Sequence, residues 1–128
     1  MSGAGPWARQ LVAQLLRQGP LGGEWTVYPH PVEQLSAPAA FVAPRTPYRE
    51  RATHRVERVN LAVVLAITRP SDADSIDGLD LKLDQIREAL ELDARIEVPA
   101  IAELGPAINV GGVEFLTGRL DIIVNTDC

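Results

Sequence analysis

Two stretches of the chain repeat their apolar residues with the 3.6-residue period of an α-helix. The first begins at Pro6, which suits an opening turn because its missing N–H would have no partner there, and it ends at Gly19-Pro20. Its apolar face is formed by Ala8, Leu11, Val12, Leu15 and Leu16. The second follows Pro70, and its single apolar stripe is formed by Ile76, Leu79, Leu83, Ile86 and Leu90. Helices with one apolar face predict covers for a sheet.

The strongest strand pattern runs from Thr53 to Arg69. One of its faces carries Val59, Leu61, Val63, Leu65 and Ile67, and the other carries Arg58, Asn60, Ala62, Val64, Ala66 and Thr68. At about 3.3 Å per residue this strand would be about 45 Å long or longer, so its first half is expected to project beyond the core. The preceding stretch, Ala43 to Ala52, is polar and predicts an exposed hairpin arm alongside it.

Shorter strands are predicted on both sides of this region. Glu24–His30 and Ala39–Ala43 lie among prolines, which restrict strands to short lengths or to sheet edges. A hairpin is expected over Ala107–Val110 and Val113–Leu116, because Gly111-Gly112 suits a two-residue turn. A final strand alternates Leu120, Ile122 and Val124 with polar residues.

The order of these elements predicts an α+β fold. We expect a mostly antiparallel sheet of four to five strands, with two helices packed on it and a projecting long hairpin. The chain has 128 residues and no internal repeat, which predicts one domain over residues 1–128. Apolar residues make up 46%, enough for a core that needs no metal or disulfide.

Composition narrows the classes of function. The net charge is −5, whereas nucleic-acid-binding domains usually have a basic excess. The longest apolar run, Leu61 to Ile67, is far below the roughly 20 residues that span a bilayer, so no membrane association is expected. The first residues lack the basic and apolar segments of a signal peptide, which predicts an intracellular protein or one released by lysis. Cys128 is the one cysteine, so no internal disulfide can form.

No constellation of catalytic or metal-binding residues is evident. His30, His54 and Cys128 do not have the spacing of a helical metal site. None of the serines lies in a Gly-x-Ser-x-Gly elbow, and Ser71 and Ser75 suit the start of a helix. We therefore predict no catalytic residue, no metal and no cofactor, and that the protein is not an enzyme.

Two further patterns have a structural explanation. Ten of the seventeen carboxylates fall between Asp72 and Glu103, and those on the second helix lie off its apolar stripe, as on a solvated acidic face. Gly111-Gly112 is not followed by the Lys-Ser/Thr of a phosphate-binding loop, so it is explained by a turn.

A local basic cluster is the candidate interaction site. It contains five of the twelve basic residues: Arg45, Arg49, Arg51, Arg55 and Arg58. One interpretation is an arm that contacts an acidic neighbouring subunit or passing DNA. The other is an exposed hairpin whose charges prevent aggregation through its edge. The contrast with the acidic second helix would suit head-to-tail packing of identical subunits.

The pattern over nearly the whole chain resembles one family of viral proteins. A first helix leads to Trp25-Thr26-Val27-Tyr28-Pro29 and to Pro38-Ala39-Ala40-Phe41-Val42. An arm rich in Tyr and Arg, a strand ending in Val63-Val64-Leu65-Ala66-Ile67 and an amphipathic helix follow. The closing segment is Gly105-Pro106-Ala107-Ile108-Asn109-Val110-Gly111-Gly112-Val113-Glu114-Phe115-Leu116. This order is similar to that of tail-terminator (tail-completion) proteins of long-tailed phages, especially actinobacterial phages.

The resemblance implies a minor tail protein that forms a homohexameric ring at the head-proximal end of the tail tube. Such a ring ends tube polymerisation and joins the tail to the head connector, while DNA passes through its lumen without sequence-specific binding. The expected partners are copies of the chain, the tail tube protein and the head–tail connector, in a virion assembled in the host cytoplasm. The family has no catalytic residues to carry over. The alternatives are a head–tail connector or neck protein, and a small ligand-binding module with a concave apolar pocket.

Overall fold

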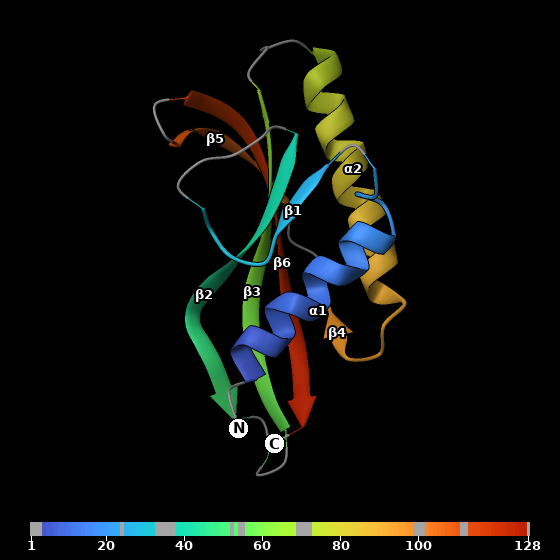
Figure 1. Ribbon diagram of the computed structural model, residues 1–128, viewed down its shortest axis with the longest axis vertical. Helices are drawn as coiled ribbons and strands as arrows, with labels where there is room; N and C mark the ends of the chain where they lie inside the picture. Colours follow the sequence, from blue (N-terminus) through green and yellow to red (C-terminus); the bar gives the residue numbers. More distant parts are fainter. Residues whose placement is uncertain are drawn as a thin grey trace.

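A computed structural model describes residues 4–23, 25–32, 38–51, 53, 56–68, 73–98, 102–110 and 113–127. The helices are α1 (Ala4–Gln18) and α2 (Ala73–Glu91). The strands are β1 (Thr26–Tyr28), β2 (Ala39–Arg51), β3 (Val56–Thr68), β4 (Ile96–Glu97), β5 (Ala102–Val110) and β6 (Val113–Asp127). They form a mixed, mostly antiparallel sheet that is curled into a half-barrel (Figure 1), so the predicted α+β class is confirmed.

The sheet has one long path of strands and one side branch. The path is β1-β2-β3-β6-β4, and β5 also pairs with β6. Only β1 and β2 are parallel. Because β3 occupies one edge of β6, β5 and β4 pair with successive parts of its other edge. The path has five strands, the upper number predicted, and β5 adds a sixth.

The last part of the chain differs in detail from the prediction. Val110 pairs with Val113, so the predicted hairpin pairing is confirmed, and Gly111 and Gly112 of the turn lie outside the described residues. Its second strand does not end near Leu116, however, but continues as β6 to Asp127, so two predicted strands are one. β5 begins at Ala102, five residues before the predicted start, and the two-residue strand β4 was not predicted.

The β2–β3 hairpin is long, as predicted. The predicted short strand Ala39–Ala43 and the polar arm after it are both part of β2. The pairing starts at Ala39–Ala66 and ends at Arg51–Glu57, with an irregularity between Pro44 and Arg49. β6 runs beside β3 along its whole length, so the outer part of the hairpin belongs to a three-stranded ribbon.

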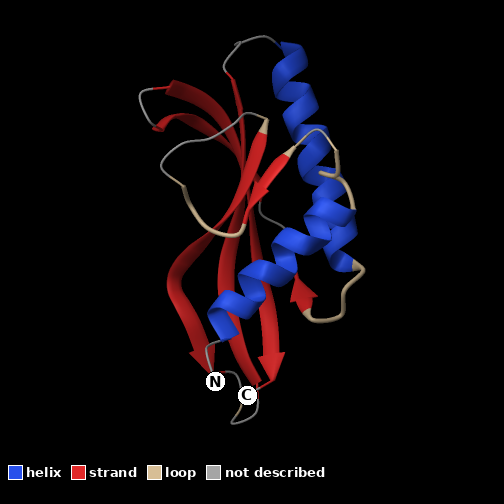
Figure 2. Ribbon diagram, viewed as in Figure 1, coloured by secondary structure: helices blue, strands red, loops and turns tan. Residues whose placement is uncertain are grey.

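Both helices lie on the same side of the sheet (Figure 2). This helix side contains the core, in which alternate residues of β3, Val59, Leu61, Val63 and Leu65, are fully buried. They pack with Leu120, Ile122 and Val124 of β6, with Ala8, Val12 and Leu16 of α1, and with Leu79, Leu83, Ile86 and Leu90 of α2. Gly118 lets α2 approach β6, because a Cβ there would lie 3.1 Å from Leu83 Cδ1. The predicted packing of both helices is thereby confirmed.

The opposite side of the sheet, which we call the open side, combines polar and apolar residues. The register places Phe41 and Ala43 of β2, Val64 of β3 and Ile123 of β6 on this side, together with the polar residues Arg58, Asn60, Asp121 and Asn125. Phe41, Ala43, Val64 and Ile123 are half-buried. Among the described elements, no helix packs against the open side.

Candidate functional site

The predicted site residues lie on the hairpin. Arg45, Arg49 and Arg51 are on β2, Arg58 is on β3, and Arg55 lies outside the described residues. Arg49 pairs with Val59 in the ladder and Arg51 with Glu57, so both project on the side of Val59. Arg58 projects on the open side. The four described arginines therefore do not form one basic patch.

Three of these arginines form ion pairs within the described chain, and Arg49 and Arg58 each bind a glutamate. Arg49 binds Glu57 in a bidentate pair across the hairpin, through Nε to Oε1 and through Nη2 to Oε2 at 2.9 Å. On the open side Arg58 Nη2 lies 3.3 Å from Glu97 Oε2 of β4. The same oxygen accepts a hydrogen bond from Asn125 Nδ2 at 3.0 Å. These contacts compensate the charges of Arg49 and Arg58 within the chain.

Arg45 shares a carboxylate with Arg119. Its Nε lies 3.7 Å from Asp121 Oδ2, and Arg119 Nε lies 2.8 Å from Asp121 Oδ1. Arg45 Nη1 is buried and has no hydrogen-bond partner, which is unusual for a charged donor. Arg51 is exposed, and among the described residues it makes no ion pair. Of the described arm, Arg51 is thus the arginine available to a neighbouring molecule, and the role of the cluster in assembly stays a prediction.

Side chains that the sequence analysis did not single out join the two strands of the hairpin and fix the hairpin to α1. Asn60 is 6% exposed and donates to Pro47 O at 2.8 Å and to Glu50 Oε1 at 2.6 Å. Arg9 of α1 donates to the Tyr48 hydroxyl, and its guanidinium lies 5.7 Å from the centroid of that ring. One indication of these contacts was present in the sequence, the polar residue Asn60 in a strand whose residues become increasingly apolar.

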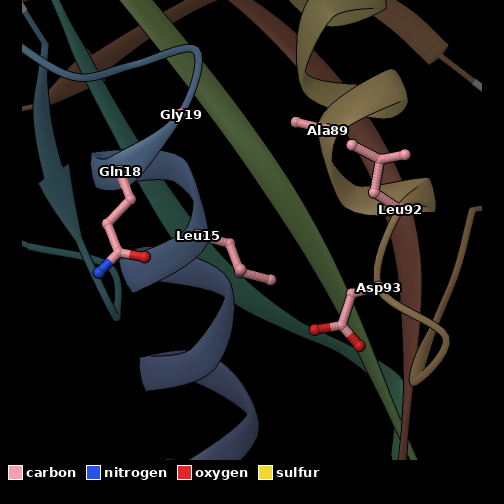
Figure 3. A pocket seen from close by; sticks show the side chains of 6 residues that line it. All are labelled: Leu15, Gln18, Gly19, Ala89, Leu92 and Asp93. Atoms are coloured by element: carbon pink, nitrogen blue, oxygen red, sulfur yellow. The ribbon is translucent and has the colours of Figure 1, made fainter.

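A groove opens between α1 and the end of α2 (Figure 3). It is lined by Leu15, Gln18, Gly19, Ala89, Leu92 and Asp93, and has a volume of about 350 Å³. The side chain of Asp93 binds Arg95, with Oδ2 2.7 Å from Nη2, and this hydrogen bond lowers the pKa of Asp93. A carboxyl group that is ionised in this way is a poor proton donor at neutral pH. The groove thus offers apolar contact beside an ionised carboxylate that is bound to Arg95.

Ligands for a metal ion are not gathered in the described part of the chain, where no three His, Cys, Asp or Glu side chains are suitably clustered. His30 is exposed, and its Nδ1 lies 2.9 Å from Pro31 O. His54, Cys128, Ser36 and Ser71 lie outside the described residues. Ser75 lies in the first turn of α2, as expected. Neither α1 nor α2, the helices of the described residues, combines the length and apolar content needed to cross a bilayer.

Comparison with known proteins provides no relative from which residue roles could be transferred. No family model matches this sequence, and no curated protein matches it. Three features of the described surface are candidates for contact with another molecule: the outer end of the hairpin, the open side of the sheet and the α1–α2 groove.

Proposed function

We propose that this chain is a structural subunit of a phage tail, a tail-terminator protein that forms a six-membered ring at the head-proximal end of the tail tube. The ring ends tube polymerisation and joins the tail to the head connector. It is part of the virion and assembles in the host cytoplasm. DNA passes through the ring without sequence-specific binding, which suits a chain with a net charge of −5.

The observation that carries this proposal is the long β2–β3 hairpin. Its ladder extends to Arg51–Glu57, and its outer residues Arg49, Glu50 and Arg51 are exposed. A compact monomer has no use for such an extension, whereas a ring subunit can reach its neighbour with it. The order of elements on which the resemblance to tail terminators rests is also the order of elements in the fold.

The open side of the sheet supports the same proposal. Phe41, Ala43, Val64 and Ile123 are only half-buried there, because no described helix covers them. An antiparallel sheet commonly exposes one face to water, and that face is then mainly polar. A partly apolar face of this kind is suited to contact with another subunit.

The first experiment measures the native mass of the purified chain at several concentrations, with and without isolated tail tubes. Negative-stain images identify any large species. We expect a closed ring, formed either alone or on the end of a tube. A chain that stays monomeric in both cases would overturn the proposal. A ring that binds the head connector but not the tube would instead assign the chain to the neck.

A charge removal tests the part played by the hairpin. Arg51→Gln should leave circular dichroism and melting unchanged, because Arg51 is exposed and makes no ion pair with another described residue. It should weaken ring formation or tube binding. Arg87→Gln removes the same charge from α2, where it loses only a surface ion pair with Asp84, and serves as the control. Equal assembly of the wild type and Arg51→Gln would remove the hairpin from the proposal.

A further inference from the structure

The groove between α1 and α2 has apolar walls that the described chain does not cover. Leu15 of α1 faces the end of α2 across it (Figure 3), and Ala89 and Leu92 form the opposite wall. Leu92 is 88% exposed, more than either Leu81 or Trp7, the other exposed large apolar side chains. Isolated exposed leucines are ordinary, but this one borders a groove with an apolar partner on the other wall.

A line of carboxylates runs along α2 and ends at Glu91, next to Leu92 of the groove. It consists of Asp77, Asp80, Asp84, Glu88 and Glu91, all exposed and spaced three or four residues apart. Leu81, Ala89 and Leu92 each directly follow one of these residues, so they lie on one flank of the line. Like charges at this spacing destabilise a helix by about 0.2–0.5 kcal/mol per pair. Only Asp84 has an ion pair among the described residues, with Arg87 at 2.9 Å.

The cations near the groove are engaged elsewhere. Lys82 Nζ donates to Pro20 O at 3.2 Å. Arg95 binds Asp93, and its guanidinium lies 5.5 Å from the centroid of the Trp7 ring. Among the described residues, Arg87 is therefore the cation that pairs with the carboxylate line, which keeps an excess of negative charge.

The chain itself is a poor complement for this surface. Of the four described arginines of the hairpin, Arg45, Arg49 and Arg58 are compensated by carboxylates of the same chain, and Arg51 remains. Over the described residues, a second copy would thus bring one hairpin arginine without an ion pair to a line in which four carboxylates have none, and both copies have a net charge of −5. The complementary occupant is a basic surface, which the described part of this chain does not carry.

We propose that the α1–α2 groove docks a basic, amphipathic segment of another protein. Its apolar side chains contact Leu15, Ala89 and Leu92, and its lysines or arginines face the carboxylate line. From Asp77 to Glu91 the line is about 20 Å long, which matches about four turns of a bound helix. This docking is separate from the proposed ring and does not depend on it.

The test uses the whole chain and a synthetic helical peptide of about 18 residues, with leucines on one face and lysines on the other. Binding is measured by calorimetry at about 0.15 M salt, where exposed charges more than about 8 Å apart are largely screened. Asp80→Asn with Glu88→Gln should weaken binding about tenfold, and Leu92→Ser should weaken it severalfold. The matched control is Glu50→Gln with Glu97→Gln, which removes two exposed carboxylates from the open side and should leave binding within about twofold.

A second peptide separates docking from simple charge attraction. It has the same composition, but its leucines are scattered around the helix, and it should bind much more weakly than the first. Equal binding of the two peptides, or an equal loss in the control variant, would overturn the proposal. A lower native mass of the Asp80→Asn, Glu88→Gln variant alone would show that the occupant is a second copy. Ring formation without peptide binding would refute this inference and leave the proposed function intact.

Discussion

The two sides of β3 are built by different means. On the helix side Val59, Leu61, Val63 and Leu65 are fully buried under α1 and α2. On the open side Arg58 and Asn60 are held by hydrogen bonds and an ion pair to carboxylates and a carbonyl of other strands. The same alternating sequence therefore builds a helix side that is held by apolar burial and an open side that combines small buried side chains, such as Ala62 and Ala66, with particular polar partners.

The magnitudes of these interactions differ accordingly. Full burial of a valine or leucine contributes about 1.5–3 kcal/mol, whereas a typical hydrogen bond contributes about 0.5–1.5 kcal/mol net. An exposed ion pair such as Arg58–Glu97 contributes about 0–1 kcal/mol. We conclude that the helix side supplies most of the stability, and that the open side positions the hairpin and presents a contact surface.

The largest effect is expected from a charge placed in the core of the helix side. Leu83→Asp should unfold the domain, because Leu83 is 2% exposed and an unpaired carboxylate there would cost several kcal/mol. Leu92→Asp, on the same helix but 88% exposed, should leave thermal melting by circular dichroism unchanged. A soluble Leu83→Asp protein with wild-type melting would contradict the packing of α2.

The helix side could be predicted from the sequence because its signal repeats within single segments. The stripe from Ile76 to Leu90 and the alternation from Val59 to Ile67 each indicate an element and its buried face without reference to the rest of the chain. Gly111-Gly112 marked its hairpin for the same reason. On this side of the sheet the sequence did not predict the full length of β6. That strand is long because β3 pairs with it along its whole length, and the local pattern of β6 does not show this pairing.

The partners on the open side and at the hairpin could not be predicted in the same way. Glu97 reaches Arg58 from a two-residue strand that has no periodicity of its own, and Asp121 reaches Arg45 from β6. The sequence therefore indicated a basic cluster, whereas the fold pairs three of its four described arginines with carboxylates. The contact of Tyr48 could not be predicted because its partner, Arg9, lies 39 residues away in the sequence.

An intermediate effect should follow from removing the anchor of the open side. Asn60→Ala deletes both bonds to the hairpin and leaves Pro47 O without this donor, which should lower the free energy of unfolding by about 1–2 kcal/mol in urea. Asn125→Ala, which loses one exposed bond to Glu97, should have the smaller effect. Equal losses would mean that the two strands of the hairpin are held together by something other than Asn60.

The smallest effect is expected at the edge of the helix side, where Arg95 lowers the pKa of Asp93. Because the folded pKa lies below the ordinary value of 3.8, the pair stabilises the fold above that pH. This stability is lost as the pH falls through the lower, folded pKa. Asp93→Asn keeps an acceptor for the Arg95 N–H. It should lower the melting temperature slightly at pH 7, by an amount that shrinks below pH 3.8. A difference that grows in acid would contradict this ion pair.

The ladder between β3 and β6 has a consequence for the kinetics of folding. It pairs Val56 with Asp127 and Thr68 with Phe115, segments roughly 50 to 70 residues apart. The β2–β3 and β5–β6 hairpins each close over short connections, but this seam must close a loop that contains all of α2. Chains dominated by such distant pairings fold in about milliseconds to seconds. We expect the two hairpins to form first. The rate at which β3 and β6 then pair should determine the folding rate of the whole domain.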